Sequence, residues 1–270
     1  MFLAGSLVGG VTGAGVARFD PLARPTATAA PATSATPLSA PGFGAVASDP
    51  YVAAVEEVLP AVVTVINRGS GGFQVGTGSG LIIDKDLGYV VTNSHVIELT
   101  RSTEPAPFID VVLSDGTRRR ATVLGNDPST DVAVLRVEGG GLPAQAALGD
   151  VKQVPLGSQV IAIGSPGISG PGTGGVLENS VTSGVVSGKG RSFPRADLRG
   201  NVILRDLVQT DAPINPGNSG GPLVWVATRQ VIGLNTLVVR GSGEEGLGFA
   251  VSSDTVKEIA AEIIARGSAR

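Results

Sequence analysis

Short apolar runs separated by polar or glycine-containing turns fill the chain from about residue 50 onward. The runs are rich in valine and isoleucine, which favour strands. Because Ser114-Asp115-Gly116 is a typical tight-turn sequence, its two flanking runs are expected to form a hairpin. One set of predicted strands covers residues 61–66, 80–84, 89–92, 110–113, 117–124 and 132–137. A second set covers residues 159–163, 181–186, 206–209, 222–225, 231–239 and 248–251.

Only the last part of the chain has a clear helical pattern, over residues 252–266. Apolar residues recur there at intervals of three and four, which places them on one face of a helix. Ser253 or Asp254 is the expected N-cap, because short polar side chains bind the first backbone N–H groups. The apolar face consists of Val256, Ile259, Ala260, Ile263 and Ile264.

Two strand sets of about a hundred residues each predict an all-β protein with two β-barrels, at 50–150 and 151–252, and a C-terminal helix at 253–270. Short strands with frequent turns are typical of sandwiches and barrels. The composition agrees, because 40 glycines and 18 prolines would destabilise a helical bundle.

The first 49 residues differ from the rest. Residues 1–17 are uncharged and apolar, but they are short for a membrane span, contain five glycines and lack a preceding basic region. They are interpreted either as the remnant of a membrane anchor or as a disordered N-terminus. Residues 18–49 are rich in proline, alanine and threonine and predict a disordered linker, since they offer little apolar surface to bury.

Charge and cysteine content exclude several classes of function. The net charge is −3, which does not favour nucleic-acid binding, and Arg118-Arg119-Arg120 is interpreted as a charged hairpin edge. The chain has no cysteine and a single histidine. Disulfides and thiolate zinc sites are therefore excluded, a metal-dependent hydrolase is poorly supported, and no cofactor or metal is expected.

The candidate chemistry rests on Ser219 and His95. Ser219 lies within Gly217-Asn218-Ser219-Gly220-Gly221, and a serine among glycines suits a nucleophile on a sharp turn. Such a serine needs a base, and His95 is the only histidine. The α/β-hydrolase arrangement requires a histidine after the serine, which this chain lacks. The order His, Asp, Ser remains.

Asp131 is the preferred acid, because it directly precedes an apolar strand and would be fixed and partly buried. Asp127 competes with it, but Asn126-Asp127-Pro128 is typical of an exposed turn. The backbone N–H groups of Gly217 and Ser219 could converge on a developing oxyanion, and glycine permits the necessary backbone angles.

The segments around these residues resemble the HtrA/Deg serine endopeptidases. The matching stretches are 92–97 (TNSHVI), 126–135 (NDPSTDVAVL), 179–187 (NSVTSGVVS), 209–223 (QTDAPINPGNSGGPL) and 246–251 (GLGFAV). The resemblance covers about residues 50–265. It implies a chymotrypsin/trypsin-like double β-barrel with His95 as base, Asp131 as the residue that orients it and Ser219 as nucleophile.

Two differences from the family pattern stand out. Ser94 occupies a position where the family usually has asparagine or alanine. Family members also usually carry one or two PDZ domains after the protease, whereas this chain ends at Arg270. Peptide sensing through such domains is therefore not expected of these residues.

The resemblance also guides expectations about substrates. Enzymes of this type that cleave after Lys or Arg have an aspartate six residues before the nucleophile, where this chain has Pro213. Ile214 is the expected pocket residue, which predicts cleavage after small or medium aliphatic residues. The strand through Leu234, Asn235 and Thr236 is expected to hold an extended substrate. Three glycine-rich segments, 165–175, 189–200 and 240–246, predict mobile loops.

The leading hypothesis is therefore an ATP-independent serine endopeptidase of protein quality control that cleaves unfolded polypeptides outside the cytoplasm. The resemblance adds a homotrimer, and residues 1–17 add a candidate membrane tether. The alternative is a non-proteolytic chaperone or binding module on a protease scaffold, although the intact His95, Asp131 and Ser219 argue against it.

Overall fold

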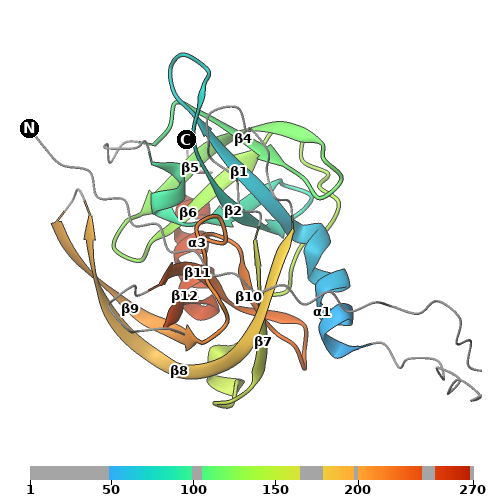
Figure 1. Ribbon diagram of the computed structural model, residues 1–270. Coiled ribbons are helices and arrows are strands. Elements are labelled where there is room, and N and C mark those ends of the chain that lie inside the picture. Colours follow the sequence, from blue (N-terminus) through green and yellow to red (C-terminus); the bar gives the residue numbers. More distant parts are fainter. Residues whose placement is uncertain (1–48, 99–104, 165–178, 198–199, 239–246, 268–270) are drawn as a thin grey trace, which may run out of the picture. The chain divides into compact units, whose positions relative to one another are not determined.

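The computed structural model describes residues 49–98, 105–164, 179–197, 200–238 and 247–267, within a compact unit that spans Val46–Arg270. Its strands form two closed antiparallel barrels of six strands each (Figure 1). The predicted all-β class, with two barrels and a C-terminal helix, is confirmed. Residues 1–48, with the apolar segment and nearly all of the linker, lie outside the described residues.

The first barrel has the strand order β1-β2-β3-β6-β5-β4, and the second has β10-β11-β12-β9-β8-β7. Numbered from its own first strand, each barrel has the same order. The first barrel consists of β1 (Val62–Arg68), β2 (Gln74–Asp84), β3 (Tyr89–Thr92), β4 (Phe108–Val112), β5 (Arg118–Asp127) and β6 (Val132–Val137). The second consists of β7 (Gln159–Gly164), β8 (Ser180–Asp197), β9 (Gly200–Thr210), β10 (Pro222–Trp225), β11 (Gln230–Val238) and β12 (Gly248–Ser252).

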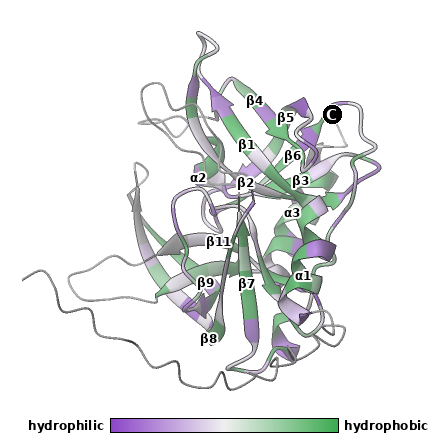
Figure 2. Cartoon of the chain, turned by 45° about the vertical axis from the view of Figure 1, so that its right-hand side comes forward, coloured by the Kyte–Doolittle hydropathy of each residue, from purple (hydrophilic) through white to green (hydrophobic). Residues whose placement is uncertain are grey.

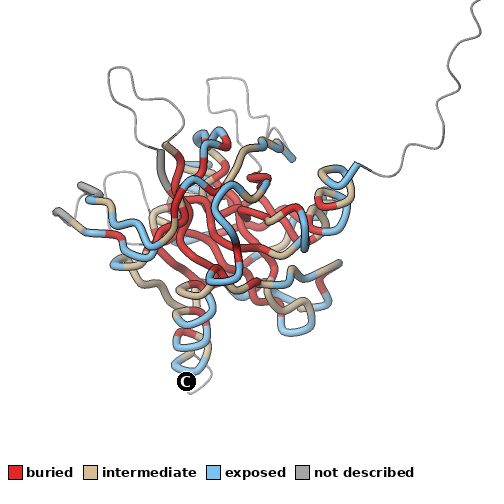
Figure 3. Tube along the Cα trace, turned by 90° about the horizontal axis from the view of Figure 1, so that it is seen from below, coloured by how far each residue is buried: buried red, intermediate tan, exposed pale blue. Residues whose placement is uncertain are grey.

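Aliphatic side chains fill both barrels, and Figure 3 shows the buried positions concentrated along the strands. In the first barrel Leu81, Val90 and Leu135 are fully buried, as are Val160 and Ile232 in the second. Because valine and isoleucine suit both the pleated backbone and close packing, the β-branched runs of the sequence form these strands.

Within the described residues three helices accompany the barrels: α1 (Pro50–Val58), α2 (Ser94–Ile97) and α3 (Ser253–Gly267). Two short 3₁₀ turns complete the elements, at Leu59–Ala61 and Val151–Gln153. The sequence interpretation missed α1, although Asp49-Pro50 is a helix-start signal: Asp49 Oδ1 accepts the Tyr51 N–H at 2.8 Å, and proline fits the first helical position. No helix among the described residues is long and apolar enough to span a bilayer.

The terminal helix α3 begins at Ser253, within the helical pattern predicted for residues 252–266. The expected cap at Ser253 or Asp254 is wrong, because the Thr255 N–H is bound by the Ser252 hydroxyl at 3.1 Å. Figure 2 shows α3 with hydrophobic and hydrophilic residues along its length. Its buried Ile263 packs against Gly125 of β5, so that the helix from the end of the chain covers the first barrel.

Two further predictions are wrong. Residues 189–197 belong to β8, which pairs with β9 as far as Asp197↔Gly200, so this segment is part of a long hairpin and not a loop. The strand with Arg118, Arg119 and Arg120 is not an edge, because β5 pairs with β4 on one side and β6 on the other. The other two predicted loops, 165–175 and 240–246, lie outside the described residues.

Candidate active site

His95 lies in the single turn α2, which directly follows β3 and Asn93. The backbone of this turn is tied to Asp131: the Ser94 N–H and the Asn93 side-chain amide both donate to the Asp131 carbonyl, at 3.1 and 3.0 Å. Since β3 and β6 are neighbours, with Thr92 opposite Ala133, the end of one strand and the start of the other lie together. Strand order therefore brings His95 to Asp131.

The Asp131 carboxylate is fully buried and faces the histidine ring. His95 Nδ1 lies 2.9 Å from Oδ2 and 3.1 Å from Oδ1, and the His95 backbone N–H donates to Oδ1 at 3.1 Å. Thr236 of the second barrel donates its hydroxyl to Oδ2 at 2.5 Å. A buried carboxylate that is held by several donors fixes the orientation of the imidazole.

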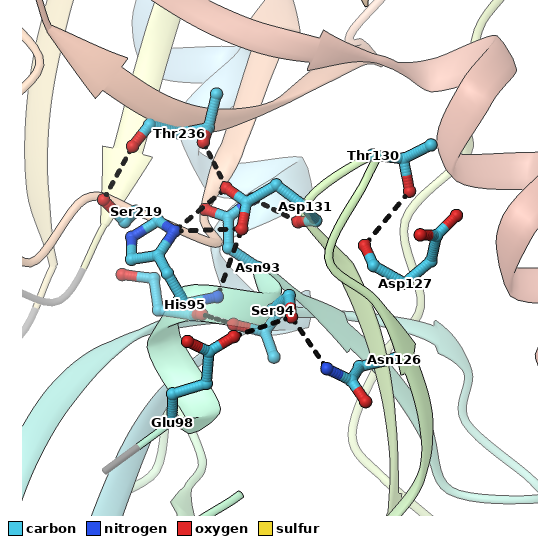
Figure 4. A network of polar contacts seen from close by, with 12 residues as sticks. Asn93, Ser94, His95, Glu98, Asn126, Asp127, Thr130, Asp131, Ser219 and Thr236 are labelled. Carbon is cyan, nitrogen blue, oxygen red and sulfur yellow. Dashed lines mark hydrogen bonds and ion pairs between the residues drawn. The ribbon is translucent and has the colours of Figure 1, made fainter. Parts of the chain in front are cut away.

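The backbone of Asp131 has a φ of +63°, which is uncommon for a non-glycine residue. Its side-chain and backbone contacts with α2 hold it in this conformation. The competing Asp127 instead accepts the Ser129 N–H at 2.8 Å and the Ser129 hydroxyl at 2.6 Å, as a turn residue does. Figure 4 places Asp127 on the far side of the Asp131 segment from His95.

Ser219 stands on a sharp turn in front of β10. Gly217 and Gly220 have φ values of +104° and +84°, and the Asn218 and Gly221 N–H groups close the turn by bonding to Asn215 and Asn218 carbonyls at 3.0 and 2.9 Å. The Ser219 hydroxyl donates to the Thr236 carbonyl at 3.3 Å. In Figure 4 the His95 ring lies between Asp131 and Ser219, with its second nitrogen toward the serine.

The backbone N–H groups of Gly217 and Ser219 are the candidate donors to an oxyanion. Within the described residues, neither the Gly217 nor the Ser219 N–H has a protein acceptor. The Asn218 carbonyl accepts the Gly221 N–H, and in a trans peptide this fixes the opposite direction for the Ser219 N–H. These donors could stabilise the oxyanion that forms on a carbonyl oxygen when the Ser219 hydroxyl attacks its carbon.

Ser79 of the first barrel supports this turn, and the sequence interpretation did not single it out. Its N–H donates to the Ser219 carbonyl at 2.8 Å, and its hydroxyl donates to the Gly217 carbonyl at 2.6 Å. The only indication in the sequence is that the polar Ser79 lies just before an apolar run. The turn that carries Ser219 is thus held from the opposite barrel.

Ser94 is a second residue whose contacts the sequence did not indicate. It is fully buried, accepts a hydrogen bond from the Asn126 side chain at 2.8 Å, and donates to Glu98 Oε1 at 3.0 Å (Figure 4). It therefore connects the end of β5, the histidine turn and the residue after that turn.

Among the described residues, no group of three or more His, Asp or Glu could hold a metal ion.

The predicted substrate residues have different surroundings. Ile214 is buried in the core of the second barrel and packs against Gly248, where an added Cβ would lie 2.8 Å from its side chain. Leu234 and Asn235 offer no strand edge, because each is paired with β12 on one side and with β10 or the segment before it on the other. Their assignment to substrate binding by strand addition is therefore wrong.

Thr236 begins the part of β11 that has an open side. Pairing with β10 ends at Leu234, whereas Leu237 and Val238 still pair with β12. Within the described residues no strand pairs with 236–238 on the other side. The Thr236 carbonyl faces Ser219 there, and its hydroxyl binds Asp131, a contact that sequence reasoning missed.

Residues 78–234 match the family model described as "Trypsin-like peptidase domain". The chain belongs to the trypsin-like peptidase family. Its relatives place it among the HtrA/Deg proteases, as the sequence resemblance predicted. It is 38% identical over 228 residues to "Serine protease Do-like HtrB" of Bacillus subtilis, covering 79% of this chain and 47% of that protein.

Further relatives agree with this assignment. The "Probable periplasmic serine endoprotease DegP-like" of Chlamydia trachomatis is 42% identical over 191 residues, covering 70% of this chain and 34% of its own length. The solved structure "HtrA-type protease AlgW with tripeptide" has a TM-score of 0.65 at 36% identity, covering 80% of this chain and 64% of that chain. This chain thus spans less than half of the length of these two curated relatives.

Proposed function

We propose that this chain is a serine endopeptidase in which Ser219 is the nucleophile, His95 the general base and Asp131 the residue that orients and stabilises the imidazole. The observation that carries the proposal is the convergence of these three side chains from two barrels, with His95 Nδ1 2.9 Å from the buried Asp131 carboxylate and its other nitrogen toward Ser219. Membership of a serine peptidase family supports it.

The reaction follows from this geometry. The Ser219 hydroxyl turns from the Thr236 carbonyl to His95 Nε2, loses its proton to the ring, and attacks the scissile carbonyl carbon. The protonated ring, stabilised by Asp131, then gives that proton to the departing amine as the C–N bond breaks. Water repeats the sequence on the acyl-enzyme: His95 takes its proton, and the Ser219 oxygen leaves with that proton.

The N–H groups of Gly217 and Ser219 form the oxyanion hole in this proposal. Their lack of protein acceptors within the described residues leaves them for the carbonyl oxygen as it gains negative charge. Such donors act in the transition state, and removing one typically costs about 10²–10³ in kcat.

Substrate recognition is proposed to use the open side of β11 from Thr236 onward together with an apolar pocket at Ile214. An extended polypeptide that pairs with this edge is read through its backbone, which suits unfolded proteins. With Pro213 where a cation-binding enzyme has aspartate, and with buried Ile214, the pocket is proposed to take small or medium aliphatic residues.

The setting of the enzyme is proposed from its relatives and its N-terminal residues. Relatives named as periplasmic endoproteases favour an extracytoplasmic location, and a role in protein quality control is proposed from the sequence resemblance. Residues 1–17 are proposed as a membrane tether and the assembly as a homotrimer. Light scattering after size exclusion should give three times the 27.0 kDa chain mass; a monomer would contradict the trimer.

Digestion of unfolded casein by the parent chain and by Ser219→Ala tests the activity. The proposal predicts cleavage by the parent alone, without ATP, mainly after aliphatic residues. Cleavage mainly after Lys or Arg would contradict the proposed pocket while leaving the nucleophile in place. No cleavage by either form, with suppression of casein aggregation by both, would favour the non-proteolytic chaperone alternative.

A further inference from the structure

A cluster of arginines surrounds one buried carboxylate on the outer face of the first barrel. Asp110 of β4 has an 8% exposed side chain and lies 2.6 Å from Arg68, 3.2 Å from Arg120 and 3.6 Å from Arg118. Three guanidinium groups face one carboxylate, so the site has a local excess of two positive charges in a chain of net charge −3. The net charge of the whole chain therefore does not reveal this local excess of positive charge.

Two of these arginines are turned to solvent. The side chains of Arg118 and Arg120 are 50% and 43% exposed. Within the described residues, neither donates a hydrogen bond to a protein acceptor beyond its ion pair with Asp110. Arg68 by contrast bonds to both Asp110 and the Gly72 carbonyl. Arg118 and Arg120 can therefore bind an external anion without giving up a structural hydrogen bond.

Exposed aromatic rings stand next to this charge. Phe108 is 43% exposed and lies opposite Arg68 on β1, with the Arg120 guanidinium 5.1 Å from its ring centroid. Phe73 is 81% exposed, at the tip of the β1–β2 hairpin. Arg68 also donates a hydrogen bond to the carbonyl of Gly72, so its guanidinium group lies next to the residue that precedes Phe73. We call Arg68, Phe73, Phe108, Asp110, Arg118 and Arg120 the basic–aromatic patch.

The hairpin that carries Phe73 is a defined element. The Gly69 N–H donates to the Phe73 carbonyl at 3.0 Å, and the Gly72 N–H donates to the Gly69 carbonyl at 2.8 Å. Figure 1 shows this hairpin, in teal, extending beyond the first barrel. An aromatic ring at the end of a protruding, internally bonded hairpin can enter a soft apolar layer with little conformational change.

We propose that the basic–aromatic patch docks on an anionic lipid surface, with Phe73 in the interfacial layer and Arg118 and Arg120 on the headgroup phosphates. Apolar insertion combined with basic residues is the pattern of peripheral membrane binding. Guanidinium groups match phosphate oxygens in pairs. The protruding tip favours a fluid lipid layer over a protein partner, because a protein would need a preformed pocket for the Phe73 ring.

A local fluorescence measurement separates this contact from any binding by residues 1–17. Because the chain lacks cysteine, an environment-sensitive dye can be attached to Gln74→Cys, beside an intact Phe73. Leu87→Cys is the matched control: Leu87 is 51% exposed, but it lies in the β2–β3 turn at the opposite end of β2. Vesicles consist of phosphatidylcholine alone or with phosphatidylglycerol.

The proposal predicts a blue shift of the dye at position 74 on phosphatidylglycerol vesicles, weakened by salt, with no shift at position 87. Arg118→Gln with Arg120→Gln should raise the vesicle concentration for half-maximal shift about thirtyfold, and Phe73→Ser should reduce the shift itself. Arg229→Gln, an exposed arginine of the second barrel paired with Glu57, should change nothing. Unchanged thermal melting identifies folded variants.

Three results would overturn the proposal. An equal shift on both kinds of vesicle would show that anionic lipid is not recognised, and equal shifts at positions 74 and 87 would show that the patch is not the contact. A shift with polyglutamate but none with vesicles would assign the patch to an acidic protein partner instead. None of these results depends on whether the chain cleaves casein.

Discussion

The two barrels share one strand order, but different kinds of residue lie at the point where the third strand of each barrel meets the sixth. In each, the end of the third strand lies beside the start of the sixth: Thr92 opposite Ala133 in the first barrel, and Thr210 opposite Gly248 in the second. The first barrel places His95 and Asp131 there. The second places Ile214 there, packed over Gly248.

The difference lies in the side chains and not in the topology. In the first barrel this meeting point is polar, and the fully buried Asp131 carboxylate there is bound by His95 and Thr236. In the second it is apolar and joins the barrel core. One architecture therefore places the residues proposed for proton transfer on one side and an apolar wall on the other, while Ser219 is held between them by Ser79.

The largest expected effect comes from removing the proton-transfer side of this comparison. His95→Ala should lower kcat/KM for a peptide substrate by about 10⁴-fold or more, because the nucleophile loses its base. Ser219→Ala should cost a similar amount, and the double variant little more, since residues that act as a unit are not additive. Independent, additive losses would contradict a shared role for the two barrels.

The junction between the barrels is the next most sensitive place. A Cβ at Gly220, where φ is +84°, would lie 2.1 Å from the Ser79 carbonyl oxygen and 2.3 Å from the Thr92 hydroxyl. Gly220→Ala should therefore destabilise the fold by more than about 3 kcal/mol, measured by urea unfolding. Gly116→Ala is the control, with φ +81° and no atom within 4 Å; only about 1 kcal/mol is expected. Equal losses would contradict close packing at Gly220.

The apolar side of the comparison should control selectivity and not rate. Ile214→Ala enlarges the proposed pocket and should shift the ratio of kcat/KM between leucine and valine substrates about tenfold toward leucine. Ile232→Ala is the control, because Ile232 is buried in the same core but is not a proposed pocket residue. It should lower stability and leave the ratio unchanged; a shift with Ile232→Ala alone would place the pocket elsewhere.

The smallest expected effect comes from Asp115, which lies in the β4–β5 turn and at neither of the two meeting points between strands. Its hydrogen bonds from Thr117, chiefly from the backbone N–H, lower the pKa of the Asp115 carboxyl below its usual 3.8. A lowered folded-state pKa gives stability that is present above pH 3.8 and lost as the pH falls through the folded value. Asp115→Asn should therefore be slightly less stable at pH 7, with the difference vanishing in strong acid. A difference independent of pH would contradict this.

The sequence predicted the elements whose local pattern and tertiary role agree. Residues 89–92, 132–137 and 222–225 are strands with the predicted bounds, because β-branched runs between turn residues are also buried in the barrels. The extension of β8 through Gly188 and Pro194 was missed, since these residues oppose strand formation and pairing with β9 keeps them in the sheet. Likewise, no local pattern indicates that Thr236 and Ser79 reach across to the opposite barrel.

The most direct test of the central claim is whether the two barrels together activate Ser219. The parent chain, His95→Ala and Ser219→Ala should be treated with a fluorophosphonate probe, and the modified residue identified by peptide mass spectrometry. The account predicts one adduct, on Ser219 of the parent, and none in either variant. An adduct on another serine, or equal labelling of Ser219 without His95, would contradict it.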